Sequence, residues 1–263
     1  MPKKLFKSIG NACFHMLKKD KRPFTSAIIL AAGKGERMKS EGVSKQMMDL
    51  EGKPVVVHTL LAFQRSRLVD EIIVVGAEHE LEIYKELKRT YRLPKLKLAV
   101  GGGDCRAVSA QHGFLSVSKE SKFVLIHDAA RCLIATEDIN RTIKEAYRFG
   151  ASIAAKKATD TVKKVDSHGF ITETVDRSSL WLAQTPQVFK RSIYEVALAK
   201  TATLDASVTD DAMLVSAAGF RVKVVECRHE NIKITTQDDL PIARMILDKR
   251  REAEAAKKAG GKA

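Results

Sequence analysis

The chain has 263 residues, of which 44% are hydrophobic and 30% are charged, and its formal net charge is +14. A chain of this length can bury one substantial core, and no apolar run approaches the ~20 residues that a membrane-spanning helix needs. Residues 1–25 hold seven Lys and Arg against one Asp, and residues 249–263 hold six against two Glu. The 223 residues between them therefore carry only +4. This balance, without an aromatic stacking platform, argues against a nucleic-acid-binding protein.

The two basic ends have no counterpart in the pattern of the central region, so we expect the folded domain at residues 25–248. Residues 1–24 place apolar side chains at roughly helical spacing between lysines. That pattern indicates either a basic amphipathic helix or a flexible solvated extension. Residues 249–263, rich in Ala, Lys and Gly, indicate a helix end or a flexible tail.

The cysteines favour a cytoplasmic protein. Cys13, Cys105, Cys132 and Cys227 are scattered without Cys-x-x-Cys or Cys/His ligand spacing, which is typical of reduced, mostly buried thiols. Residues 1–24 also lack the continuous apolar segment and the small-residue cleavage site of a secretory signal.

Strand-like and helical patterns alternate along the chain. The strand-like runs are 27–31, 71–75, 96–100, 123–126, 152–155 and 221–225. The helical patterns are 55–64, 80–91, 107–117, 137–149, 191–199 and 210–218. Such alternation predicts an α/β fold: a Rossmann-like, mostly parallel twisted sheet with helices on both faces. Ligands of open α/β folds bind at the carboxyl ends of the strands.

One stretch breaks the alternation. Residues 162–166 and 170–175 read as two strands joined by a turn at 167–169, which predicts a β-hairpin. Because an isolated two-stranded ribbon is barely stable in water, we expect this arm to extend the sheet or to lie against another subunit.

The first strand-like run leads into a glycine-rich turn. Residues 26–38 read SAIILAAGKGERM, in which the apolar run stops at Gly33 and charged residues surround Gly35. A turn of this kind offers backbone N–H groups to a phosphate, and Lys34 and Arg37 add positive charge. A lone Gly-x-Gly fits an ordinary strand-to-helix turn equally well.

A second glycine loop and an acidic residue follow later strand-like runs. Residues 101–103 are three glycines, after which Arg106 and Ser109 fall near the start of a helix, another setting for a phosphate. Asp128 comes just after the run at 123–126, and a carboxylate among phosphate ligands suits Mg²⁺. Asp128 and Arg131 could alternatively form a surface ion pair that contributes little.

Two further cations stand at the ends of elements. Arg177 follows the hairpin, and Lys233 lies in a strand-like run at 230–235. Taken singly, the first could be a solvated charge and the second a residue that protects a sheet edge. With the two glycine loops and Asp128, they make a phosphate site at the sheet edge the better interpretation.

The ordered series of motifs resembles the 2-C-methyl-D-erythritol 4-phosphate cytidylyltransferase family from about residue 25 to residue 247. The motifs are LAAGKGERM at 30–38, KQ at 45–46, GGDxR at 102–106, DAAR at 128–131, DT at 160–161, VDR at 175–177, QTPQ at 184–187 and NIK at 231–233.

The resemblance implies a Mg²⁺-dependent transfer of CMP from CTP to a polyol phosphate, with release of pyrophosphate, on the non-mevalonate route to isoprenoids. Residues matching the catalytic positions are Arg37 and Lys45, for the transition state, and Arg177 and Lys233, which hold the polyol phosphate. Residues matching the CTP positions are Ala31, Ala32, Gly33, Gly35, Gly103, Asp104, Arg106, Ser109 and Ala129. Residues matching further polyol-phosphate contacts are Asp128, which also lies near Mg²⁺, Arg131, Thr161 and Thr185.

The resemblance also implies a homodimer in which an arm, here at about 157–178, completes the partner's site. Two positions depart from the family pattern, since Cys132 and Ser44 stand where proline is usual. The nearest alternative is a ribitol 5-phosphate cytidylyltransferase, which shares most of these motifs. Residues 31–33, 128–131 and 180–181 favour the methylerythritol enzyme. A catalytically silent homologue is disfavoured because every cation matched to a transition-state role is present.

Overall fold

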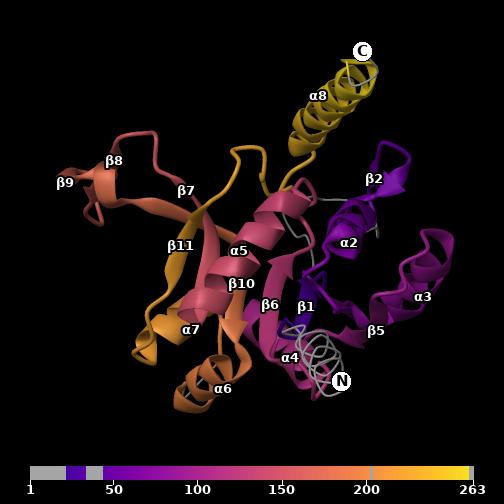
Figure 1. Cartoon of the computed structure of the whole chain (residues 1–263). Helices are drawn as coiled ribbons and strands as arrows, with labels where there is room; N and C mark the ends of the chain where they lie inside the picture. Colours follow the sequence, from indigo (N-terminus) through magenta and orange to yellow (C-terminus); the bar gives the residue numbers. More distant parts are fainter. Residues whose placement is uncertain (1–21, 34–43, 202–203, 261–263) are drawn as a thin grey trace, which may run out of the picture.

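A seven-stranded sheet with the strand order β11-β7-β10-β6-β1-β4-β5 forms the centre of the molecule (Figure 1). We describe a computed structural model of the chain, which covers residues 22–33, 44–201 and 204–260. The strands of this sheet are β1 Thr25–Leu30, β4 Glu71–Gly76, β5 Leu96–Gly101, β6 Phe123–Asp128, β7 Ala151–Lys157, β10 Trp181–Lys190 and β11 Lys223–Glu226. Neighbouring strands pair in parallel except where β10 pairs antiparallel with β6 and β7. The predicted mostly parallel sheet is confirmed.

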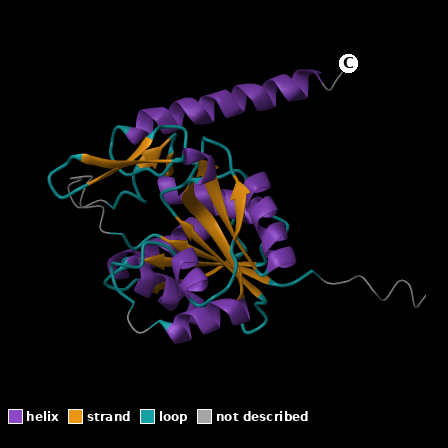
Figure 2. Ribbon diagram, turned by 90° about the vertical axis from the view of Figure 1, so that its left-hand side faces the viewer, coloured by secondary structure: helices purple, strands orange, loops and turns teal. Residues whose placement is uncertain are grey.

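Helices cover both faces of the sheet, as predicted (Figure 2). One face packs against α2 Val55–Arg65, α3 Leu81–Thr90 and α5 Thr136–Phe149; the other packs against α4 Arg106–Leu115, α6 Arg191–Lys200 and α7 Asp211–Ala217. Alternate residues of β1 serve the two layers, since Ala27 and Ile29 join the first core and Ile28 joins the second. A strand buried on both faces needs a continuous apolar run, and this is why β1 could be recognised in the sequence.

Strand β10 is the main strand that the sequence patterns missed. Pro186 within this segment argues against a central strand, because proline cannot donate to the ladder. The structure accommodates it at an irregularity, where the pairing of β10 with β7 shifts register between Ala183 and Gln187. Further elements were not predicted either: the hairpin of β2 Asp49–Leu50 and β3 Lys53–Pro54, the 3₁₀ turns η2 Glu78–Glu80 and η3 Arg177–Ser179, and the first ten residues of helix α8 Asp239–Gly260.

The predicted hairpin is present as β8 Val162–Val165 and β9 Ile171–Val175, followed by the 3₁₀ turn η3 Arg177–Ser179. The two strands pair only with each other among the described residues. They project from the body as an arm (Figure 1). Gly169 lies in the turn with a φ of 85°, a left-handed conformation that favours glycine.

The C-terminal region contains one helix, α8 Asp239–Gly260, which extends away from the body toward the C-terminus (Figure 2). Residues 249–260, for which a helix end or a flexible tail was expected, continue this helix. The proposed domain limits themselves stay predictions, and most of residues 1–24 lies outside the described chain.

The strand expected at 230–235 is wrong: these residues form a loop, whose Ile234 N–H donates to the Ala130 carbonyl at 2.8 Å. Within the described ranges, no helix has the length and apolarity to cross a membrane.

Candidate active site

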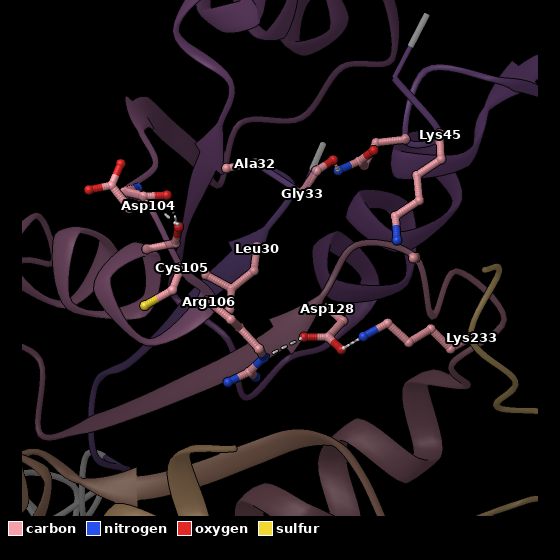
Figure 3. Close-up of a pocket in the computed structure, with 13 residues that line it drawn as sticks. Leu30, Ala32, Gly33, Lys45, Asp104, Cys105, Arg106, Asp128 and Lys233 are labelled. Carbon is pink, nitrogen blue, oxygen red and sulfur yellow. Dashed lines mark hydrogen bonds and ion pairs between the residues drawn. The ribbon is translucent and has the colours of Figure 1, made fainter. Parts of the chain in front are cut away.

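A cavity of about 580 Å³ opens where the parallel strands β1, β5 and β6 end (Figure 3). The topology explains this position, because parallel strands present their carboxyl ends at one edge of the sheet. Nine residues selected from the sequence line this cavity: Ala32, Gly33, Lys45, Gly103, Asp104, Arg106, Ser109, Asp128 and Lys233. The structure thus brings together side chains that are up to two hundred residues apart in the chain.

Asp128, at the end of β6, is held between two cations. Its Oδ1 accepts a hydrogen bond from Arg106 Nε at 3.1 Å, and its Oδ2 accepts one from Lys233 Nζ at 2.7 Å (Figure 3). The residue is only 8% exposed. Burial by itself would raise the pKa of Asp128, but Arg106, Lys233 and Arg131 outweigh it, and the pKa lies well below its usual range. The carboxylate is therefore ionised at neutral pH.

A second carboxylate fixes Arg106 from behind. Arg106 Nη1 donates to Asp211 Oδ2 at 2.7 Å, and Tyr194 Oη donates to the other oxygen of Asp211 at the same distance. Asp211 and Tyr194 are both buried. Although burial disfavours the charged guanidinium, Asp211 and Asp128 together raise the pKa of Arg106. Sequence patterns gave no role to Asp211, which looked like one more acidic residue at a helix start.

A chain of hydrogen bonds fixes the backbone around Asp128. The Asp128 N–H donates to Thr185 Oγ1 at 3.1 Å, and this hydroxyl lies 3.0 Å from His127 Nδ1. Because the Thr185 oxygen accepts from the amide, its own proton is available for Nδ1. The neutral imidazole then carries its proton on Nε2, which lies 3.3 Å from the Arg131 carbonyl oxygen. His127 thus connects β10 to the loop after β6, a role that no sequence motif indicated.

The loop that carries Lys233 is anchored by its neighbour Asn231. The amide of Asn231 donates to Gln184 Oε1 at 2.9 Å and to the Thr185 carbonyl at 3.0 Å. Arg131 Nη1 donates to the backbone oxygen of Asn231 at 3.0 Å. These contacts hold the loop against β10 and bring Lys233 to Asp128.

Neighbouring side chains pack directly against the backbone of the second glycine loop. A Cβ atom on Gly102 would lie 2.3 Å from the Cβ of Ala32, and one on Gly103 would lie 2.2 Å from a methyl carbon of Val108. Side chains are therefore excluded at both positions. The Gly103 N–H donates to Ser109 Oγ at 3.1 Å, which ties the loop to the first turns of α4. Asp104 and Ser109 lie on the cavity wall beside it.

The first glycine turn is described as far as Gly33. The Ala31 N–H donates to the Val75 carbonyl at 2.7 Å, and the Ala129 N–H donates to the Leu30 carbonyl at 2.9 Å. Ala31 and Ala129 are buried behind the cavity wall rather than on it. Gly35 and Arg37 lie outside the described residues, so their predicted roles stay predictions. Lys45 extends from the chain beyond this turn toward the Asp128–Lys233 pair (Figure 3).

Two selected residues lie away from this cavity. Thr161 and Arg177 flank the arm and are exposed, and Arg177 donates from Nη1 to the Thr159 carbonyl oxygen. Thr185 and Arg131 occupy an intermediate position, next to Asp128 but not on the cavity wall. The predicted site residues therefore fall into two separate groups, one at the cavity and one on the arm.

Comparisons with known proteins show the family to which the chain belongs. The family model described as IspD, 2-C-methyl-D-erythritol 4-phosphate cytidylyltransferase, matches residues 25–249. Enzymes of that name from Alkaliphilus metalliredigens and Syntrophus aciditrophicus are 40% and 42% identical to this chain; each match covers 87% of this chain and 95% and 97% of the relative, respectively. A crystal structure of 4-diphosphocytidyl-2C-methyl-D-erythritol synthase from Anaerococcus prevotii superposes with a TM-score of 0.73 at 32% identity, covering 86% of this chain and 99% of that one. The Francisella tularensis cytidylyltransferase superposes with a TM-score of 0.70 at 31% identity, covering 85% and 99%. The chain belongs to the 2-C-methyl-D-erythritol 4-phosphate cytidylyltransferase family.

Proposed function

We propose that this protein transfers CMP from CTP to 2-C-methyl-D-erythritol 4-phosphate, giving 4-diphosphocytidyl-2-C-methyl-D-erythritol and pyrophosphate. The observation that carries the proposal is the ionised Asp128 held by Arg106 and Lys233 in a cavity between two glycine loops. Family membership supports the identity of both substrates.

The reaction is an in-line displacement at phosphorus. A phosphate oxygen of the polyol phosphate attacks the α-phosphorus of CTP, a new P–O bond forms, and the bond to pyrophosphate breaks. Such a reaction depends on positioning and on neutralising the charge that builds up on the phosphates. Lys45 extends toward the Asp128–Lys233 pair and suits the transition state, together with Arg37. Lys233 would hold the attacking phosphate.

Backbone and side-chain donors of the glycine loops suit the nucleotide. Gly103, Asp104 and Ser109 form one wall of the cavity, and Ala32 and Gly33 form another. Gly102 and Gly103 let the second loop pack directly against Ala32 and Val108, which keeps the two loops close together at the cavity. Cytidine would lie against the second loop and the triphosphate against the first.

Asp128 suits a Mg²⁺ ion that takes one carboxylate and completes its shell with substrate phosphates and water. Its lowered pKa keeps it an anionic oxygen ligand, although Arg106 and Lys233 share its oxygens. The described part of the chain contains no group of three or more His, Cys, Asp or Glu side chains that could hold a metal alone. Bound Mg²⁺ would neutralise charge on the triphosphate.

We further propose that the enzyme is a homodimer in which the arm reaches the partner's cavity. Thr161 and Arg177 then contribute to the site of the other subunit. Exposed apolar side chains on the arm support this, because Phe170 and Ile171 are 71% and 63% exposed and apolar patches of this kind mark contact surfaces.

We also propose a cytoplasmic location. The three described cysteines are free thiols, and burial raises the pKa of Cys132 to about 12 and that of Cys227 to about 11. Buried, unreactive thiols of this kind are typical of a reducing compartment.

The test is pyrophosphate release from CTP and Mg²⁺ with either 2-C-methyl-D-erythritol 4-phosphate or ribitol 5-phosphate as acceptor. We expect turnover with the first, and a Lys45→Ala variant as control should lose it. Faster turnover with ribitol phosphate would replace the proposed substrate, and turnover with neither would overturn the proposed function.

A further inference from the structure

We propose that Gln46 is a positioning residue that fixes residues 31–33, where the chain leaves β1, for the triphosphate; this inference rests on the proposed function. The Gln46 side chain is 2% exposed. Its Nε2 donates to the Ala31 carbonyl oxygen and, at 3.2 Å, to the Gly33 carbonyl oxygen. The amide of Gln46, the residue that follows Lys45, therefore binds two carbonyls at the exit of β1.

These two hydrogen bonds act where the sheet no longer supports the chain. Ala31 makes the last link to β4 through its N–H, which donates to Val75. The carbonyls of Ala31 and Gly33 lie beyond that point and are held by Gln46. Since a peptide unit is planar, fixing the Ala31 carbonyl also fixes the direction of the Ala32 N–H. Ala32 and Gly33 both line the cavity.

Gln46 is itself anchored. Its backbone carbonyl accepts a hydrogen bond at 2.9 Å from the N–H of Val56, near the start of α2. Val56 is fully buried, so α2 provides a rigid support. The same anchor fixes the backbone next to Lys45, and Gln46 thereby positions the turn and the catalytic lysine together.

The second atom of the amide indicates more than a structural role. Gln46 Oε1 is buried and meets no hydrogen-bond donor among the described residues. Leaving such an acceptor unpaired costs about 1–3 kcal/mol, so a position that served packing alone would favour an apolar side chain. Since this oxygen is buried, the amide is explained by the two carbonyls that Nε2 holds at the cavity wall, and not by a direct contact with the substrate.

The test compares two changes at Gln46 with a matched change elsewhere. Gln46→Met keeps the size of the side chain but removes both donor bonds, and Gln46→Asn keeps the amide but shortens its reach. Gln64→Met is the control, since Gln64 Oε1 accepts from the Lys95 N–H at 3.1 Å, on the other end of α2 and outside the cavity.

We expect both Gln46 variants to raise KM for CTP about tenfold, the effect of losing roughly one net hydrogen bond. KM for the polyol phosphate should change less than twofold, and Gln64→Met should change neither KM. Calorimetric binding of CTP without the acceptor should show the same tenfold weakening, and Gln46→Asn serves if Gln46→Met does not fold.

Equal CTP affinity in wild type and in the folded variants would overturn the inference, as would a parallel rise in both KM values. If the wild type itself neither binds CTP nor turns over, the proposed function fails instead. The two failures are thus distinguishable.

Discussion

The cations of the cavity and the cation Arg177 on the arm differ in the contacts that they make within their own chain. Arg106 and Lys233 both contact Asp128, and Arg106 is supported from behind by the buried Asp211. Arg177 on the arm is exposed and contacts a backbone carbonyl. The cavity is thus arranged within one chain, whereas Arg177 on the arm is exposed to solvent.

The ion pairs of the two regions differ in the same way. Lys164 and Glu173 form a pair on the arm at 2.6 Å, with side chains 64% and 52% exposed. Exposed pairs of this kind contribute about 0–1 kcal/mol. In contrast, removal of one partner from a buried pair costs about 3–5 kcal/mol, because a charge is left without compensation. Charge changes in the cavity should therefore have much larger effects than charge changes on the arm.

The sharpest test of this contrast is Asp128→Asn. The variant keeps the shape but removes the charge that faces Arg106 and Lys233, together with the candidate Mg²⁺ ligand. We expect kcat to fall about 10³-fold, the range found when a preorganised charged group is lost, as measured by pyrophosphate release.

The matched change on the arm is Glu173→Gln, which breaks the exposed pair with Lys164 and should alter kcat less than twofold. An Asp128→Asn enzyme with more than a tenth of wild-type turnover would show that the cavity is not the catalytic centre.

The second test asks whether the arm acts on the other subunit. Arg177→Gln and Lys45→Ala should each reduce activity about 10²-fold. When the two variants are mixed and allowed to exchange subunits, half of the dimers carry one defect on each chain. In those dimers one site combines both defects and the other is intact, so activity should recover to about a quarter of the wild type.

Activity recovers only if Arg177 contributes to the active site of the partner subunit. If Arg177 acted within its own chain, every site would keep one defect, and the mixture would stay as inactive as its components. Native mass spectrometry of the mixture, which separates heterodimers from the two homodimers by mass, controls for subunit exchange.

The third test addresses the contact that the arm would make. Burying a phenylalanine contributes about 1.5–3 kcal/mol, so Phe170→Asp should weaken the dimer at least about tenfold and lower activity at dilute protein. Sedimentation velocity over a range of concentrations measures the shift. Leu115→Asp is the control on the body, because Leu115 is 74% exposed and lies at the end of α4. Equal dissociation of both variants would argue against a dimer contact at the arm tip.

The features that the sequence predicted are those with a distinctive pattern in their own segment. Strands such as β1 and β6 were found because strands buried on both faces are continuous apolar runs, and the glycine loops were found because their composition is distinctive. β10 was missed because Pro186 argues against a central strand. The loop carrying Lys233 was taken for a strand because its alternating apolar residues mimic one.

The residues that position the site were missed in the sequence for a different reason. Asp211, His127 and Gln46 owe their roles to partners between 13 and 105 residues away in the chain. Each looks ordinary in its own segment, and only the fold brings it to its partner. Arg106, Arg177 and Lys233 were found because they lie at the ends of predicted elements, and Lys45 was found because a family motif contains it.

The smallest effect concerns His127, the buried histidine beneath Asp128, against the exposed His168 in the arm turn. Burial lowers the pKa of His127 to about 3, although Asp128 favours the charged form, whereas a solvated imidazole has a pKa of ~6.5. Between these values the unfolded chain binds a proton that the folded chain does not. The free energy of unfolding therefore falls as the pH is lowered below ~6.5, by at most about 1.4 kcal/mol per pH unit.

In His127→Gln this contribution is absent, so denaturant titrations between pH 6.5 and 4.5 should give a shallower dependence of the unfolding free energy on pH than in the wild type. His168→Gln is the matched control, because that side chain is exposed in the folded chain. An unchanged slope in His127→Gln would mean that the imidazole takes up its proton in the folded state, and the hydrogen-bond chain from Asp128 through Thr185 could not then be as assigned.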